Sequence, residues 1–133
     1  MYELVVRSQF AAAHNLRDYG GKCEALHGHN WQVDVLVRAE SVGGGGMVLD
    51  FRILKGEVEE ALRTLDHTYL NDLPFFQEEE PTTENIARYI YEALTERLHH
   101  YQLRPYKITA WESENAGASY LGGSNDRRPK PAR

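Results

Sequence analysis

Residues 23–31, Cys-Glu-Ala-Leu-His-Gly-His-Asn-Trp, lead into a run in which every second residue from Trp31 to Val37 is apolar. That period of two predicts a half-buried strand over about residues 29–40. Extended backwards, the strand places His27 and His29 on one face, because residues two apart project the same way. Backbone pairing fixes the separation of two such imidazoles, so the pair suits a divalent metal.

A second alternating run upstream supplies a third histidine. It predicts a strand over roughly residues 2–13 with His14 at its end. If the two strands pair antiparallel, the end of the first lies beside the start of the second, and His14 joins His27 and His29. Three imidazoles suit zinc and leave a fourth position open. The alternative is a closed structural site with Cys23 as the fourth ligand.

Length, charge and cysteine content limit the class of protein. The 133 residues fit one domain, and we expect it to span residues 1–120. A net charge of −5 argues against general nucleic-acid binding, which requires clustered Lys and Arg. One cysteine excludes an intrachain disulfide, and no 18-residue apolar run or signal-peptide pattern occurs. We therefore expect a soluble cytoplasmic protein without nucleic-acid or membrane partners.

The remaining pattern predicts further elements. The glycines at 43–46 suggest a hairpin into a third strand at 47–49. A helical period begins at about Phe51, and Pro81-Thr82-Thr83-Glu84-Asn85 marks the start of a second helix. A last strand follows at 106–114. This order predicts an α+β fold with a four-stranded antiparallel sheet and two helices on one face.

Three other features lie outside this pattern of strands and helices. Glu112 lies on the apolar face of the last strand, which predicts a buried carboxylate, or else a strand that has already ended. Arg17 and Lys22, in the loop before Cys23, are expected to be solvated. Residues 121–133 contain few apolar side chains and are expected to form a disordered tail.

These motifs together resemble the 6-pyruvoyl-tetrahydropterin synthase family over residues 2 to about 120. The resemblance rests on His14, the Cys-x-x-x-His-Gly-His-Asn run at 23–30, Leu65-Asp66-His67, Pro81-Thr82-Thr83-Glu84-Asn85 and Trp111-Glu112. The three-residue gap between the cysteine and the first histidine resembles the gap found in the bacterial 6-carboxy-5,6,7,8-tetrahydropterin synthases of queuosine biosynthesis.

The resemblance implies a fold, an assembly and a reaction. The fold is the tunnelling fold (T-fold), in which strands of three subunits close a barrel and two trimers form a homohexamer. The substrate is 7,8-dihydroneopterin triphosphate, converted to 6-carboxytetrahydropterin with release of acetaldehyde and triphosphate. The same family leaves open a 6-pyruvoyltetrahydropterin product.

The resemblance also implies roles for individual residues. The implied zinc ligands are His14, His27 and His29. The implied catalytic residues are Cys23 as general base, Asp66 and His67 in proton transfer, and Glu112 as the anchor of the pterin. Thr82, Thr83 and Glu84 are implied to line the pterin pocket together with Glu112.

Overall fold

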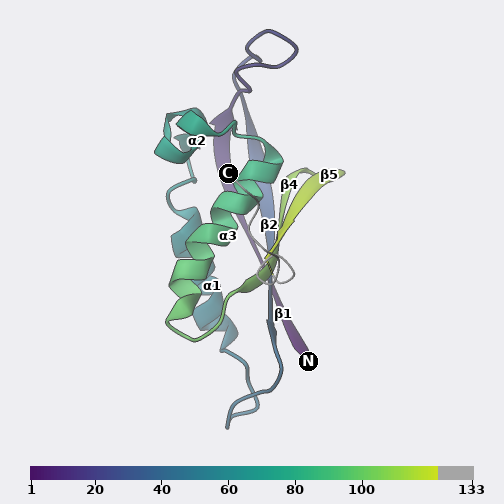
Figure 1. The fold of residues 1–133 in the computed structure, drawn as a ribbon, viewed down its shortest axis with the longest axis vertical. Helices are drawn as coiled ribbons and strands as arrows, with labels where there is room; N and C mark the ends of the chain where they lie inside the picture. Colours follow the sequence, from purple (N-terminus) through teal and green to yellow (C-terminus); the bar gives the residue numbers. More distant parts are fainter. Residues whose placement is uncertain (123–133) are drawn as a thin grey trace, which may run out of the picture.

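A computed structural model describes residues 1–122, and two long strands form its centre (Figure 1). Strands β1 (Tyr2–His14) and β2 (His27–Ala39) pair antiparallel along their full length, from Tyr2 opposite Ala39 to His14 opposite His27. Both strands were predicted from the period of two, and their antiparallel pairing is the arrangement under which the histidines were expected to converge. The register places His14 directly beside His27 at one end of the sheet.

The sheet has five strands in the order β3-β1-β2-β4-β5. Strand β4 (Pro105–Ser113) pairs antiparallel with β2, and β5 (Ala116–Leu121) pairs antiparallel with β4. The two-residue strand β3 (Thr68–Tyr69) runs parallel to β1. The sheet is therefore mixed, and the prediction of four antiparallel strands is wrong in this detail.

The prediction of a third strand at 47–49 is also wrong. These residues form bends that lead directly into helix α1 (Phe51–Leu62). The Asp50 side chain accepts a hydrogen bond from the main-chain N–H of Arg52 and so caps this helix. An apolar run of three residues is too short to distinguish a strand from the approach to a capped helix.

Two long helices cover one face of the sheet, as predicted (Figure 1). They are α1 and α3 (Thr83–His99), and α3 begins at the predicted cap, where Thr82 Oγ1 accepts from the main-chain N–H of Asn85. Between them lie a 3-10 turn, η1 (Leu70–Asp72), and the short helix α2 (Pro74–Glu78). None of these helices is long and apolar enough to cross a membrane, within residues 1–122.

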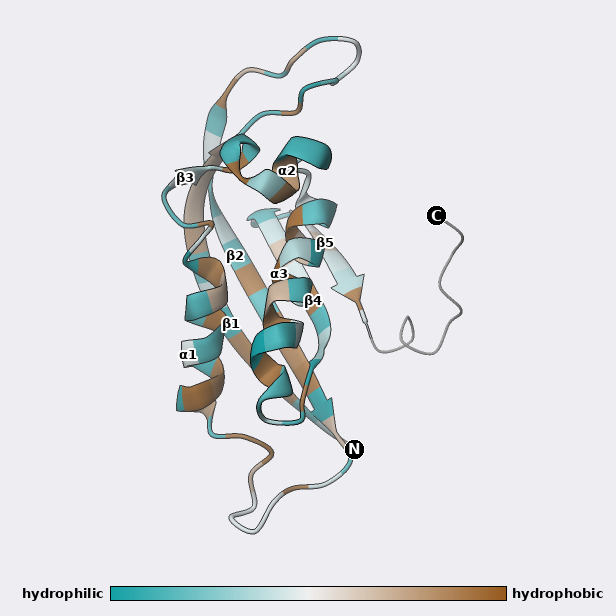
Figure 2. Ribbon diagram, turned by 60° about the vertical axis from the view of Figure 1, so that its left-hand side comes forward, coloured by the Kyte–Doolittle hydropathy of each residue, from teal (hydrophilic) through white to brown (hydrophobic). Residues whose placement is uncertain are grey.

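The core lies between the helices and the sheet. Val33 and Val35 of β2 are fully buried beneath Leu54 of α1 and Leu94 of α3. Figure 2 shows the apolar residues of the strands alternating with polar ones, as expected of a sheet with one covered face. The opposite face is polar: Asp34 accepts hydrogen bonds there from Arg7 at 2.8 Å and from Trp111 Nε1 at 3.1 Å.

The described chain ends just after β5. Leu121 is the last residue of that strand, and the main-chain N–H of Gly122 donates to the carbonyl of Tyr106 at 2.9 Å. The rest of the tail predicted over residues 121–133 lies outside the described residues.

Candidate functional site

Three histidines gather at one end of the sheet. His14 ends β1, and His27 and His29 begin β2, so the antiparallel register brings all three to the face that the helices cover. One ligand nitrogen from each lies within 4.8 Å of the others. The ring centroids are 4.7 Å apart for His14 and His27 and 4.8 Å apart for His27 and His29. The predicted convergence is thus present.

Main-chain carbonyls fix the protonation of two of these rings. His14 Nδ1 lies 2.8 Å from the carbonyl oxygen of Pro81, and His27 Nδ1 lies 2.8 Å from that of Ala25. A carbonyl oxygen only accepts, so both Nδ1 atoms carry a proton, and in the neutral ring Nε2 is the atom with the lone pair that can bind a metal. Among residues 1–122, the Nε2 atoms of His14 and His29 are buried and have no hydrogen-bond partner.

The surroundings of His29 disfavour its protonated form. Burial lowers the pKa of His29; Glu112 opposes this effect, while His14 and His27 add to it. The fully buried Trp31 lies under the cluster, with its ring 5.2 Å from that of His14 and 5.3 Å from that of His29. Neutral, rigidly held imidazoles with free lone pairs are the ligands that zinc takes in proteins, so these residues fit the implied metal.

Cys23 lies apart from these ligand atoms. It is exposed on the loop between β1 and β2, and its thiol donates to the main-chain carbonyl of Arg17 at 3.1 Å. Among residues 1–122, the group of side chains close enough to share a metal contains the three histidines and not Cys23. This arrangement does not supply the fourth ligand of a closed zinc site.

Arg17 itself is not solvated as expected. Its side chain and main chain both bind Glu80, and its guanidinium also donates to main-chain carbonyls at the end of α2. Lys22 is exposed, as predicted. Local sequence patterns could not predict the contacts of Arg17, because its partner Glu80 lies 63 residues further along the chain.

Glu112 lies at the rim of the histidine cluster. Its Oε1 accepts a hydrogen bond from Thr83 Oγ1 at 3.2 Å, and its Oε2 lies 4.0 Å from His29 Nε2. The side chain is 38% exposed, so the prediction that it is buried is wrong. A register shift near the end of β4 ends the covered part of the strand here. A half-exposed carboxylate can still accept from a ligand.

The residues at the start of α3 have separate roles. The Thr82 hydroxyl accepts from Asn85 and is used as the helix cap. Thr83 orients Glu112, and Glu84 is exposed in the first turn of the helix. Of the three residues expected around the pterin, the structure links Thr83 directly to Glu112.

Asp66 and His67 form a pair on the other side of β1. Asp66 Oδ1 accepts from the main-chain N–H of Ala11 at 2.9 Å, and Oδ2 lies 3.1 Å from His67 Nδ1. The hydrogen bond from Ala11 is the main reason that the pKa of Asp66 is lowered. His67 has a positive φ of 58° and an 81% exposed side chain.

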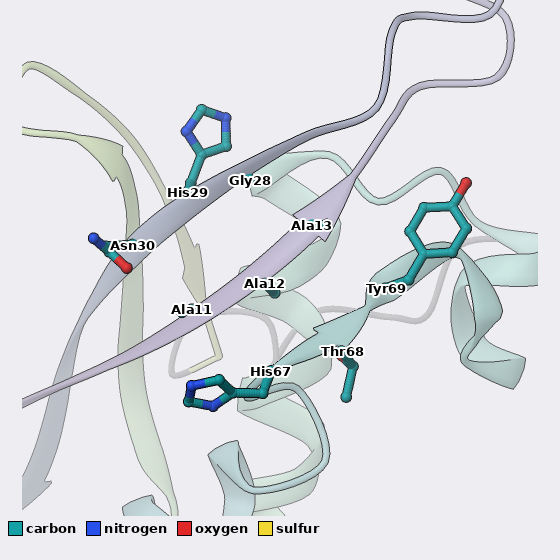
Figure 3. A pocket seen from close by; sticks show the side chains of 9 residues that line it. All are labelled: Ala11, Ala12, Ala13, Gly28, His29, Asn30, His67, Thr68 and Tyr69. Carbon is teal, nitrogen blue, oxygen red and sulfur yellow. The ribbon is translucent and has the colours of Figure 1, made fainter.

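His67 borders an open hollow of about 520 Å³ that His29 also lines. Figure 3 shows the rings of His29 and His67 pointing away from each other across strand β1. Within one chain, therefore, the structure does not bring Asp66 and His67 to the histidine cluster.

Comparisons with known proteins agree on one family. A family model described as 6-pyruvoyl tetrahydropterin synthase matches residues 3–123. The chain is 40% identical over 101 residues to 6-carboxy-5,6,7,8-tetrahydropterin synthase of Synechocystis sp., covering 72% of this chain and 77% of that protein. It is also 40% identical over 106 residues to human 6-pyruvoyl tetrahydrobiopterin synthase, covering 77% and 72%.

A solved structure extends the match to the fold. The structure of Caenorhabditis elegans 6-pyruvoyl tetrahydropterin synthase superposes with a TM-score of 0.79 and 29% identity, covering 92% of this chain and 96% of that one. Sequence, fold and the order of the motifs all lead to the same assignment. The chain belongs to the 6-pyruvoyl tetrahydropterin synthase family.

Proposed function

We propose that the protein is a zinc-dependent 6-carboxy-5,6,7,8-tetrahydropterin synthase. It converts 7,8-dihydroneopterin triphosphate to 6-carboxytetrahydropterin, acetaldehyde and triphosphate, a step of 7-deazaguanine and queuosine biosynthesis in the cytoplasm. The observation that carries the proposal is the cluster of three histidines beside a carboxylate. The name of the Synechocystis relative and the three-residue gap between Cys23 and His27 support this product.

Different residues of the chain bind the metal and the pterin. His14, His27 and His29 hold the metal; when bound, zinc supplies Lewis-acid polarisation that eases removal of protons from neighbouring carbons. Glu112, oriented by Thr83, accepts from the N–H and amino groups of the pterin.

Proton transfer needs protein groups on both sides of the substrate's reacting side chain. Cys23 acts as general base from the loop between β1 and β2, where it is accessible. The Asp66–His67 pair carries a second proton, with Asp66 holding the His67 ring at 3.1 Å. Because this pair lies away from the cluster of its own chain, it serves the site of a neighbouring subunit.

The assembly that allows this is a homohexamer of two trimers. Strand β3 pairs only with Ala12 and Ala13, which leaves most of one edge of β1 unpaired within residues 1–122. Such edges are a liability that closure of a barrel removes. The polar sheet face, with Arg7 and Asp34, then lines the interior of the barrel.

The second candidate is 6-pyruvoyl-tetrahydropterin synthesis. The human relative, which carries that name, is as similar in identity as the Synechocystis one. A non-catalytic zinc site is disfavoured, because Cys23 points to a main-chain carbonyl and not to the histidines.

Product analysis separates these functions. The zinc-loaded protein is incubated with 7,8-dihydroneopterin triphosphate, and the products are identified by mass spectrometry. We expect 6-carboxytetrahydropterin together with acetaldehyde. Formation of 6-pyruvoyltetrahydropterin would establish the second candidate, and an unchanged substrate would refute both.

A further inference from the structure

A short linker between α2 and α3, residues 79–82, contacts two parts of the site that lie far apart in sequence. The Pro81 carbonyl accepts from Nδ1 of the metal ligand His14 at 2.8 Å. One residue earlier, Glu80 binds Arg17 in the loop that carries Cys23. The linker is itself fixed, since the Glu80 carbonyl accepts from Asn85 Nδ2 at 2.9 Å.

The contact between Glu80 and Arg17 is bidentate and involves both main chain and side chain. Glu80 Oε1 accepts from the main-chain N–H of Arg17 at 2.7 Å, and Oε2 accepts from its Nε–H at 3.2 Å. The guanidinium also donates to the carbonyl of Phe76 and, at 3.3 Å, to that of Glu79, at the negative end of α2. Charge-assisted contacts of this kind are directional and hold a peptide group in one orientation.

The held peptide is the one that contacts the cysteine. The Arg17 carbonyl accepts from the Cys23 thiol at 3.1 Å. Between these residues the loop is a small hairpin, closed by two main-chain hydrogen bonds between Tyr19 and Lys22 and by one from Glu24 N–H to the Leu16 carbonyl. Gly20 and Gly21 take the positive φ values of its turn.

Because the hairpin is closed internally, its place relative to the histidines depends on its contacts with the rest of the fold. Asn15, at its base, is bonded to Asn71, and Arg17 is bonded to Glu80. The contact between Arg17 and Glu80 is the nearer of the two to Cys23. It joins the hairpin to the same linker whose Pro81 carbonyl orients His14.

We propose that Glu80 is a positioning residue for the reaction. Through Arg17 it holds the Cys23 hairpin at a fixed distance from the histidine cluster, so that the thiol is in reach of substrate bound there. This inference rests on the proposed function, in which Cys23 removes a proton. Glu80 itself touches no reacting atom.

The test compares Glu80→Gln with Glu79→Gln in the full-length, zinc-loaded protein. Both changes remove one negative charge from the same linker, but the Glu79 carboxylate pairs with Arg88 at 3.3 Å and not with Arg17. The first readout is trypsin cleavage after Lys22, which reports how often the hairpin opens. We expect cleavage several-fold faster in Glu80→Gln and at the wild-type rate in Glu79→Gln.

The second readout is the split between kcat and KM for 7,8-dihydroneopterin triphosphate. A misplaced base lowers kcat by roughly ten- to a hundredfold and leaves KM and zinc content unchanged, because ground-state binding is intact. Arg17→Ala should produce the same phenotype, and adding it to Glu80→Gln should change kcat little further.

Two results would overturn the proposal. Either equal cleavage and kcat in the two glutamine variants, or loss of zinc together with a raised KM in Glu80→Gln, would show that Glu80 does not act through the hairpin. If the wild type shows no synthase activity, the proposed function fails, and the cleavage comparison still decides whether Glu80 holds the hairpin.

Discussion

Proton positions at the histidine cluster are set by the main chain. Pro81 and Ala25 each accept from an Nδ1 atom, so His14 and His27 enter the cluster with their rings already oriented. Burial lowers the pKa of His29, which favours the form of the ring that can bind a metal. The protein therefore has little to reorganise when a metal enters.

The variant Cys23→Ala distinguishes two possible roles of Cys23, general base and zinc ligand. If the thiolate is the base, the variant should keep its zinc and its fold but lose roughly 10²–10⁴-fold in turnover. Zinc content and turnover are measured on the same sample. A collapse of zinc affinity would identify Cys23 as a ligand, and retained turnover would mean that another group, with His67 the first to examine, removes the proton.

Glu112→Gln tests recognition of the pterin. The amide keeps the size of the side chain but loses one acceptor and the charge, so binding of a pterin such as sepiapterin should weaken by about 1.5–3 kcal/mol. Calorimetry measures the affinity, and zinc content is the control. Glu114→Gln, an exposed change just beyond β4, is the matched variant. Unchanged affinity in Glu112→Gln would rule out this role.

Sequence reasoning reached the cluster for a physical reason. Residues two apart share a strand face, and antiparallel pairing brings the ends of β1 and β2 together, so three histidines could be placed without a structure. The contacts of Pro81 with His14 and of Glu80 with Arg17 could not be found this way, since each joins residues more than 60 positions apart.

At the scale of elements, a carboxylate helps to join the turn after α1 to the sheet. Asp66 accepts the main-chain N–H of Ala11 in β1, which joins the end of the helix to the edge of the sheet. This bond stabilises the charged form and lowers the pKa of Asp66 in the folded protein. The stability it provides is fully present above the unfolded pKa of about 3.9 and is lost as the pH falls through the lower folded value.

We therefore expect Asp66→Asn to flatten the acid dependence of stability. Between about pH 4 and pH 2, the melting temperature of the wild type should fall more steeply than that of the variant, at equal protein concentration. Asp18→Asn, a change in an exposed loop, is the control. Parallel curves for wild type and Asp66→Asn would show that the bond to Ala11 does not contribute.

The elements that sequence reasoning missed have weak local signals. Strand β5 contains Gly117, where a Cβ would lie 2.7 Å from the Trp111 ring, so close strand packing and not β propensity selects the residue. Strand β3 is two residues long and forms only because α1 ends beside β1. The long amphipathic helices, by contrast, were predicted from period and caps.

For the whole molecule, the separation of Asp66 and His67 from the histidine cluster is the central structural fact. A site completed by a neighbouring subunit would account for this separation, and most of one edge of β1 is unpaired within residues 1–122, which leaves room for such a neighbour. We expect light scattering to give six times the mass of one chain. Dilution to monomer should abolish turnover, because the proton-transfer pair is then absent; a stable, active monomer would contradict the proposed assembly.

Zinc stoichiometry tests the account most directly, since every proposed role is arranged around the three histidines. Elemental mass spectrometry of the purified protein should give about one zinc per chain, and the double variant His27→Ala/His29→Ala should have almost none. His99→Ala/His100→Ala, two histidines at the end of α3, is the control and should keep its zinc. Full zinc occupancy in His27→Ala/His29→Ala would contradict the account.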